Sequence, residues 1–163
     1  MTDVRTLIVD VYVLRPAAGG GARAGARAPE VLVLRRAAGE RCAGTWETVH
    51  GHIDDGEAPV AAARRELREE TGLAPERLYN VSRVETFYLH ARDVVALIPV
   101  FCAFVPAGAP VVLSAEHDRA EWLGPDEAAH RFAWPRERRA LADVLQLFGT
   151  GDAGGVEDVL RIL

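Results

Sequence analysis

The chain has 163 residues, a length that fits a single domain burying roughly two thirds of its unfolded surface. Hydrophobic residues make up 49% and charged residues 26%, and every apolar run is interrupted early, which excludes a membrane span and argues against wholesale disorder. Nineteen basic residues against 24 acidic ones give a net charge of −5, so the chain lacks the basic surface that holds nucleic-acid backbones.

The first residues do not combine a basic head, an apolar run and a cleavage site, so we expect no secretory leader. The two cysteines, Cys42 and Cys102, lack Cys-x-x-Cys spacing. These features predict a cytoplasmic protein that works in a reducing compartment. We expect its partners to be small molecules, with no membrane and no nucleic acid among them.

Strands dominate the first third of the chain. Residues 6–14 are rich in β-branched side chains and predict a strand, and residues 31–34 and 46–53 predict two more, the last interrupted by Gly51. Between the first two, residues 15–29 are rich in Gly, Ala and Arg without periodicity, which predicts a flexible insert. Residues 58–71 then predict a helix, with Pro59 in its first turn and Gly72 just after its end.

The later elements alternate less regularly. Residues 81–90 and 94–105 predict two strands joined by a short turn and therefore antiparallel, and Pro99 predicts an edge position or a bulge in the second. Residues 119–123 predict a shorter strand. Two helices, each with proline at its start, are expected over 125–132 and 135–148.

This order of elements predicts an α/β protein with a mixed sheet and helices packed against it. We expect one domain over residues 1–148 and a C-terminal tail over 149–163, in which a glycine-rich linker (149–155) leads to a short terminal element. The insert and the tail could each build a homodimer contact or a lid over a pocket, and both alternatives stay open.

Three glutamates form the first candidate site. Glu66, Glu69 and Glu70 lie at i, i+3 and i+4 of the predicted helix, which places them on one stripe at about 100° per residue. Like charges at this spacing repel, and no lysine or arginine follows them by three or four residues. A divalent cation would make the stripe favourable, since Mg²⁺ takes carboxylate oxygens and leaves positions for substrate phosphates. A solvated acidic face is the alternative interpretation.

The residues that flank the stripe favour the metal site. From residue 51 to 73 the chain reads GHIDDGEAPVAAARRELREETGL, which resembles the Nudix box, G-x5-E-x7-R-E-U-x-E-E-x-G-U with U a bulky aliphatic residue. Every fixed position of the box is met, by Gly51, Glu57, Arg65, Glu66, Leu67, Glu69, Glu70, Gly72 and Leu73.

The resemblance implies a Nudix fold, an α/β/α sandwich with a mixed sheet. It also implies a Mg²⁺-dependent hydrolase that acts on a phosphoric anhydride bond of a nucleoside diphosphate derivative, and Mn²⁺ could replace Mg²⁺. By the same resemblance Glu66, Glu69 and Glu70 are metal ligands, with Glu66 the leading candidate for the general base. Gly51, Glu57, Arg65 and Gly72 then have structural roles in the box.

The C-terminal half resembles one branch of this family, the bacterial dihydroneopterin triphosphate pyrophosphatases, also known as dATP pyrophosphohydrolases. Glu116-His117, Trp122-Leu123 and Trp134 carry this resemblance. It implies that Glu116 is a fourth metal ligand, whereas a residue that caps a strand turn is the alternative.

Candidate substrate-binding residues come from the same likeness. Arg35 stands where that branch places an arginine on the substrate phosphates, and Arg5 is a weaker parallel. His50 replaces the first glycine before the box, and its backbone carbonyl would still face a metal. Tyr88 lies close to a tyrosine of dinucleoside polyphosphate hydrolases. Solvated arginines and a core tyrosine are the alternative interpretations.

The sequence leaves three functions open. The first is a pyrophosphohydrolase that cleaves a nucleoside or pterin triphosphate to its monophosphate and pyrophosphate. The second is a dinucleoside polyphosphate or nucleotide-sugar hydrolase of the ADP-ribose type. The third is a non-catalytic Nudix module that binds a nucleotide, which the complete set of glutamates disfavours.

Overall fold

A computed structural model describes residues 1–17 and 28–163, so residues 18–27 of the predicted insert lie outside the described chain. Eight strands form one mixed sheet, in which the path β1-β7-β2-β3-β4 is extended by β5 on β2, β6 on β7 and β8 on β3. The strands are β1 (Asp3–Thr6), β2 (Ile8–Arg15), β3 (Glu30–Arg36), β4 (Trp46–Glu47), β5 (Val49–His52), β6 (Arg77–Leu89), β7 (Val94–Phe104) and β8 (His117–Leu123).

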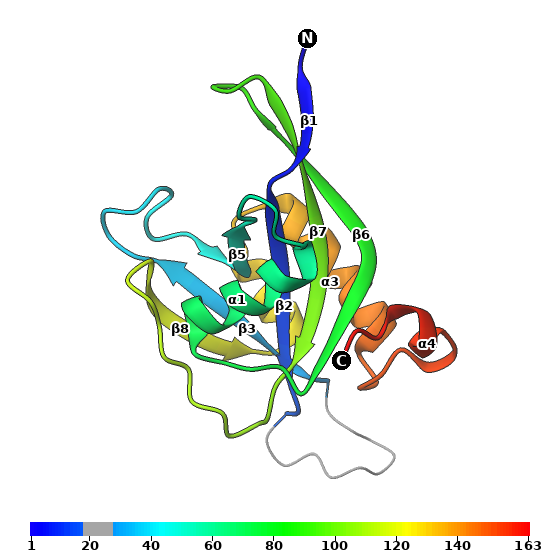
Figure 1. Cartoon of the computed structure of the whole chain (residues 1–163). Helices are drawn as coiled ribbons and strands as arrows, with labels where there is room; N and C mark the ends of the chain where they lie inside the picture. The colour runs from blue at the N-terminus through cyan, green and yellow to red at the C-terminus, as the bar shows by residue number, and fades with distance from the viewer. Residues whose placement is uncertain (18–27) are drawn as a thin grey trace.

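Helices cover both faces of this sheet (Figure 1). One face packs against α1 (Pro59–Thr71), and the other packs against α2 (Pro125–Arg131) and α3 (Pro135–Phe148). The α/β/α sandwich with a mixed sheet is therefore confirmed. None of the helices in the described part of the chain is long and apolar enough to cross a membrane.

Strand β2 shows how the sequence builds both layers at once. Successive side chains of a strand point to opposite faces. Val9 and Val11 accordingly pack in the cluster beneath α1, whereas Tyr12 and Leu14 pack in the cluster beneath α3. All four are fully buried, as expected for a central strand with helices on both sides. Asp10 shares the face of Tyr12 and is equally buried.

Pro99 sits in the middle of the sheet. Strand β7 lies between β6 on one side and β1 and β2 on the other, so the expected edge position is wrong. An irregularity does occur here, but its extra residues lie in the neighbouring strand: Pro99 pairs with Val84 directly after the register shift that follows Asn80 of β6. On its other side β7 pairs first with β1 and then with β2. Leu97 is the last residue of β7 that pairs with β1, and Val100 is the first that pairs with β2. The missing N–H of proline therefore falls where the ladder is already interrupted.

The last residues return to the sheet. After α3 come the short helices η1 (Gly154–Val156) and α4 (Glu157–Leu160), where the sequence predicts a linker and a terminal element. Tyr79 of β6 donates a hydrogen bond from its hydroxyl to Glu157 over 2.9 Å, and Leu160 is buried in the core beneath α3. The C-terminal segment therefore packs against β6 (Figure 1).

Candidate active site

The candidate site lies on both sides of β5. This strand pairs with β2 and packs against α1, and its side chains alternate between the two layers. Gly51 faces α1, where Glu66 lies against it. His50 faces the opposite way, toward Asp10 and the start of α3. One short strand thus separates a group of carboxylates from a pocket.

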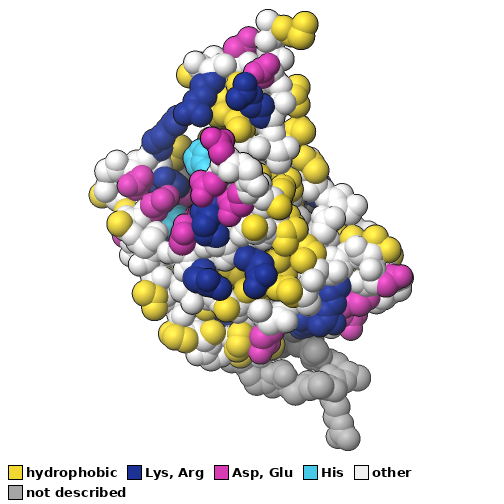
Figure 2. Space-filling model, viewed as in Figure 1, with side chains coloured by type: hydrophobic (Ala, Val, Ile, Leu, Met, Phe, Trp, Pro, Cys, Tyr) yellow, Lys and Arg dark blue, Asp and Glu magenta, His cyan; other side chains and the backbone are white. Residues whose placement is uncertain are grey.

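Helix α1 presents the carboxylates because its ends and its inner face are fixed. Pro59 begins the helix, and Gly72 ends it with a left-handed conformation (φ +69°), its N–H bonded to the carbonyl of Arg68. Ala62, Ala63 and Leu67 are fully buried beneath the sheet. This packing places the glutamate stripe next to β5. Figure 2 shows carboxylates gathered on this face of the molecule among arginine and histidine side chains.

Arg65 ties these carboxylates together. Its guanidinium lies 2.7 Å from Glu57, 2.7 Å from Glu66 and 3.1 Å from Glu69, and it also donates to the carbonyl of His52 over 2.8 Å. Glu57 accepts in addition from the N–H of Asp54. Arg65 thereby relieves the repulsion along the stripe and fixes the loop before α1.

Glycine is required at position 51. A Cβ built there would lie 1.9 Å from Cδ of Glu66, far inside any van der Waals contact. The Glu66 side chain therefore occupies the space that any other residue would fill. Burial raises the pKa of Glu66, and the effect of nearby Glu69 and Glu116 adds to it, although Arg65 acts in the opposite direction.

Glu70 is the most deeply buried of the three glutamates. Burial, together with the charges of Glu66, Glu47 and Glu116, raises its pKa to about 9. Among the described residues its Oε2 atom has no hydrogen-bond partner, and it lies 3.9 Å from Nδ1 of His117, which has none there either. A buried carboxyl group with a free oxygen is stable either as the neutral acid or, when ionised, beside a cation.

The donor set fits a hard divalent cation. Within residues 1–17 and 28–163, no three His, Cys, Asp or Glu side chains converge as a ready-made ligand cage, and Arg65 forms ion pairs with Glu66 and Glu69. The candidate ligands nevertheless offer only oxygen atoms: the free oxygen of Glu70, the half-buried carboxylate of Glu66, and the exposed carboxylates of Glu69 and Glu116. This chemistry suits Mg²⁺, which needs few protein ligands and keeps its waters.

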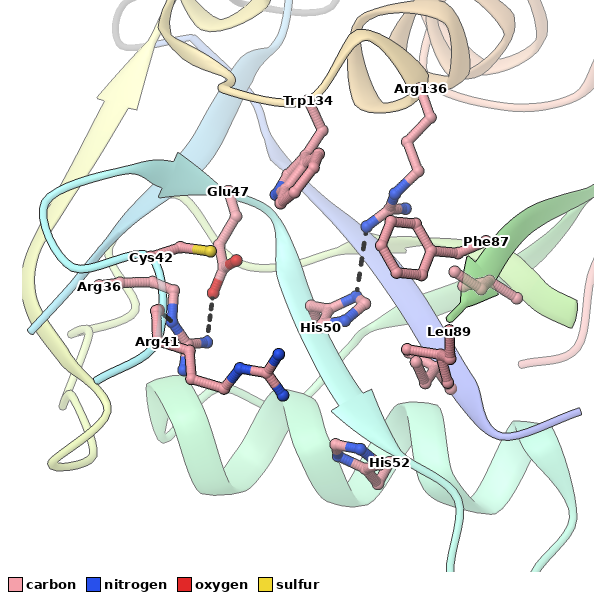
Figure 3. A pocket seen from close by; sticks show the side chains of 12 residues that line it. Arg36, Arg41, Cys42, Glu47, His50, His52, Phe87, Leu89, Trp134 and Arg136 are labelled. Carbon is pink, nitrogen blue, oxygen red and sulfur yellow. Dashed lines mark hydrogen bonds and ion pairs between the residues drawn. The ribbon is translucent and has the colours of Figure 1, made fainter. Parts of the chain in front are cut away.

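A pocket of about 240 Å³ opens on the other side of β5 (Figure 3). Its walls are mostly apolar, and the rings of Phe87 and Trp134 meet edge to face with centroids 6.1 Å apart. Charged groups line the rest. The lining residues are Ile8, Arg36, Arg41, Cys42, Glu47, His50, His52, Phe87, Leu89, Ile98, Trp134 and Arg136.

A buried ionic group fixes the polar side of this pocket. Asp10 accepts from Nδ1 of His50 over 2.6 Å on one oxygen and forms an ion pair with Arg136 on the other. Burial alone would raise the pKa of Asp10, but His50 and Arg136 together hold it below its usual value. The Asp10 carboxylate is therefore an anion that orients both partners.

Not every predicted substrate residue reaches the pocket. Arg5 lies on β1 and pairs with Asp3, and Arg35 pairs with Asp118 over 2.7 Å. The hydroxyl of Tyr88 donates to Asp93, away from the pocket. Their sequence neighbours Arg36 and Phe87 line it instead, since adjacent side chains of a strand point to opposite faces.

Sequence reasoning missed several residues of the site, among them Asp10, Arg136 and Glu47. Asp10 could have been found, because it interrupts the apolar run from Leu7 to Leu14 and a buried strand rarely carries an unpaired charge. Its partner Arg136 lies 126 positions further along the chain, and nothing local points to it.

Comparison with known proteins extends the match beyond the box. A family model described as NUDIX domain matches residues 11–144. The octanoyltransferase of Myxococcus xanthus is 37% identical over 122 residues, which cover 71% of this chain and 32% of that protein. The asymmetrical bis(5'-nucleosyl)-tetraphosphatase of Mus musculus is 33% identical over 85 residues, which cover 51% of this chain and 58% of that protein. The chain thus spans less than two thirds of the length of these relatives.

Solved structures share the fold. The Ap4A hydrolase of C. elegans superposes with a TM-score of 0.67 at 23% identity, covering 85% of this chain and 94% of that one. The dihydroneopterin triphosphate pyrophosphohydrolase of E. coli superposes with a TM-score of 0.59 at 25% identity. The superposition covers 82% of this chain and 91% of that one. In both cases the likeness extends over most of each chain.

Proposed function

Because the chain belongs to the NUDIX domain family, we propose that it is a Mg²⁺-dependent pyrophosphohydrolase that cleaves a nucleoside or pterin triphosphate to its monophosphate and pyrophosphate. One observation carries the proposal. A pocket with two aromatic walls lies directly across β5 from the carboxylates of α1, so a ring and its phosphate chain can occupy both regions together.

The aromatic walls support a planar ring as the recognised group. Phe87 and Trp134 offer faces for stacking, and such stacking on a base contributes about 1–3 kcal/mol. Arg136 and His50 then face the polar edge of the ring, since Asp10 holds both in place. A pterin and a purine each present acceptor atoms on such an edge, which an arginine recognises well.

The glutamates of α1, together with Glu116 just before β8, supply the chemistry. Glu66, Glu69, Glu70 and Glu116 would hold Mg²⁺, which when bound neutralises phosphate charge and makes water more acidic. Glu66 takes the proton of the water that attacks phosphorus, while the P–O bond to the pyrophosphate breaks and pyrophosphate leaves. The raised pKa of Glu66 suits a general base better than an ordinary carboxylate would. Arg65 fixes the position of Glu66 through its 2.7 Å contact.

The comparisons favour a second candidate, hydrolysis of a dinucleoside polyphosphate. The named activity of the mouse relative and of the C. elegans structure supports it. The same carboxylates would serve this reaction, and the two candidates differ in the group attached to the far end of the phosphate chain.

A substrate panel tests the proposal. Release of pyrophosphate and of inorganic phosphate would be measured for the four dNTPs, dihydroneopterin triphosphate, diadenosine polyphosphates and ADP-ribose, with Mg²⁺ and with EDTA. We expect metal-dependent pyrophosphate from a triphosphate, and activity confined to the other compounds would overturn the first candidate.

The variant Glu66→Gln, measured with the same panel, tests the role of Glu66 as the general base. It should lower turnover by about 10²–10⁴-fold, the range for loss of a general base, and leave nucleotide binding largely intact. Unchanged turnover in the variant would remove Glu66 from the role of base.

A further inference from the structure

Arg41 differs from the other arginines around the site. It lies in the loop between β3 and β4 and lines the pocket, and in the described part of the chain its guanidinium has neither an ion pair nor a hydrogen bond. The neighbouring arginines are all neutralised. Arg36 pairs with Glu47 over 2.8 Å, Arg136 pairs with Asp10, and Arg65 pairs with Glu57.

The backbone beneath Arg41 is held firmly. Arg36 donates from Nε to the carbonyl of Arg41 over 2.6 Å, and its own carbonyl accepts from the N–H of Gly44 over 2.9 Å. The hydroxyl and the N–H of Thr45 both donate to the carbonyl of Cys42, over 2.6 and 3.1 Å. Arg41 is thus an exposed cation that extends from a fixed point of the chain.

The direction of its side chain is informative. In Figure 3 the Arg41 side chain extends from the loop toward β5, and its guanidinium lies between the Arg36–Glu47 pair and His52. His52 is the last residue of β5 and lines the same pocket, and its carbonyl is bound by Arg65. Arg41 therefore points to the region between the aromatic pocket and the carboxylates of α1.

With the proposed substrate bound, that region would carry an excess of negative charge. A triphosphate carries several negative charges, and the site adds those of Glu66, Glu69 and Glu116. Since Arg36, Arg65 and Arg136 are already paired with carboxylates, they offer little further neutralisation. A planar guanidinium with all its N–H groups available suits two phosphate oxygens at once.

We propose that Arg41 binds the phosphate chain of the substrate as it passes from the aromatic pocket to α1. This assignment rests on the proposed function and deepens it, because it gives the enzyme a cationic contact for the phosphates in addition to the metal held by the glutamates. It also replaces Arg35 in that role, since Arg35 pairs with Asp118 outside the pocket.

The test compares Arg41→Ala, Arg41→Lys and Arg139→Ala. Arg139 is an exposed arginine of α3 that does not line the pocket, so its removal changes the net charge equally. Binding of inorganic tripolyphosphate with Mg²⁺ would be measured by calorimetry, and kcat and KM would be measured for the triphosphate that the panel identifies. Thermal unfolding of each variant serves as the control for folding.

We expect Arg41→Ala to weaken tripolyphosphate binding by about tenfold and to raise KM by a similar factor, as for a lost charge-assisted hydrogen bond. Arg41→Lys should recover part of the loss, and Arg139→Ala should match the wild type. Equal binding by the wild type and Arg41→Ala, or no binding of tripolyphosphate by the wild type, would overturn the assignment. Loss of tripolyphosphate binding in Arg41→Ala without hydrolysis of any triphosphate by the wild type would uphold it and reject the proposed function alone.

Discussion

The two sides of β5 are built in different ways. On the α1 side all functional groups except Glu116 come from one continuous segment, Gly51 to Gly72. They are charges crowded against each other with Arg65 between them. On the α3 side the pocket is assembled from β2 to β7, the loop between β3 and β4, and the start of α3. It is largely apolar apart from the ion pairs of Asp10 with Arg136 and of Glu47 with Arg36.

This difference predicts a division of labour. Crowded, partly desolvated carboxylates are suited to hold a cation and move a proton, and their position decides the rate of the chemical step. An apolar pocket with a preformed polar side is suited to recognise a ring, and its loss weakens binding. Substitutions on the α1 side should therefore lower kcat, and substitutions on the α3 side should raise KM.

After Glu66→Gln, the largest effect is expected for Gly51→Ala, which acts on the α1 side. The added Cβ would lie 1.9 Å from Cδ of Glu66, and the end of that flexible side chain must move away. Displacement of a reacting group by about 1 Å lowers turnover by about 10²-fold, so kcat should fall while the protein still folds. The measurement is steady-state hydrolysis of the substrate that the panel identifies.

Gly108→Ala is the matched control, because a Cβ there would meet no heavy atom within 4 Å. If Gly51→Ala and Gly108→Ala had equal kcat values, the position of Glu66 would not limit the reaction.

A smaller effect on KM is expected for Phe87→Ala, which acts on the α3 side. Loss of one stacking ring costs about 1–3 kcal/mol, so KM for a nucleoside or pterin triphosphate should rise about tenfold with kcat nearly unchanged. Binding of inorganic tripolyphosphate should not change, since it has no ring.

Tyr88→Ala gives the sharpest contrast to Phe87→Ala. Tyr88 is the adjacent residue of β6, and its hydroxyl is bonded to Asp93 outside the pocket. A larger rise of KM in Tyr88→Ala than in Phe87→Ala would mean that the ring binds on the other face of β6.

The same comparison explains what could be predicted from the sequence. The carboxylate helix was predictable because its residues are local: the i, i+3, i+4 spacing defines the stripe, and Pro59 and Gly72 mark the helix ends. The layers were predictable from the order of strands and helices. Both depend on patterns within a few turns of chain.

The pocket could not be predicted in this way. Asp10 and Arg136 meet only when β2 and α3 pack together. No local sequence pattern shows which residues of these two elements will lie opposite each other. On β3 and β6 the predicted substrate residues, Arg35 and Tyr88, are each one position away from the residues that line the pocket, Arg36 and Phe87. An error of one residue reverses the face of a strand, so side-chain direction needs the exact register.

The smallest effect on catalysis, and a distinct one on stability, is expected for Glu137→Gln beneath the pocket. Glu137 is fully buried at the start of α3. Its Oε1 atom accepts from the N–H of Thr48 over 3.1 Å, and its Oε2 atom has no partner in the part of the chain that the structure describes. Burial and the nearby charge of Asp10 raise its pKa to about 8, although Arg136 acts in the opposite direction.

The folded chain therefore keeps a proton on Glu137 that the unfolded chain releases at its ordinary pKa of 4.5. Between these two values the folded state binds more protons, so this group lowers the free energy of unfolding as the pH rises from about 5 to about 8. Glutamine keeps the bond to Thr48 and cannot ionise. Urea unfolding at both pH values should show that Glu137→Gln is less sensitive to pH than the wild type, by on the order of 1–3 kcal/mol. Glu127→Gln, at an exposed position of α2, is the control and should be as sensitive to pH as the wild type. If the free energy of unfolding fell equally in all three proteins between the two pH values, a protonated Glu137 would be contradicted.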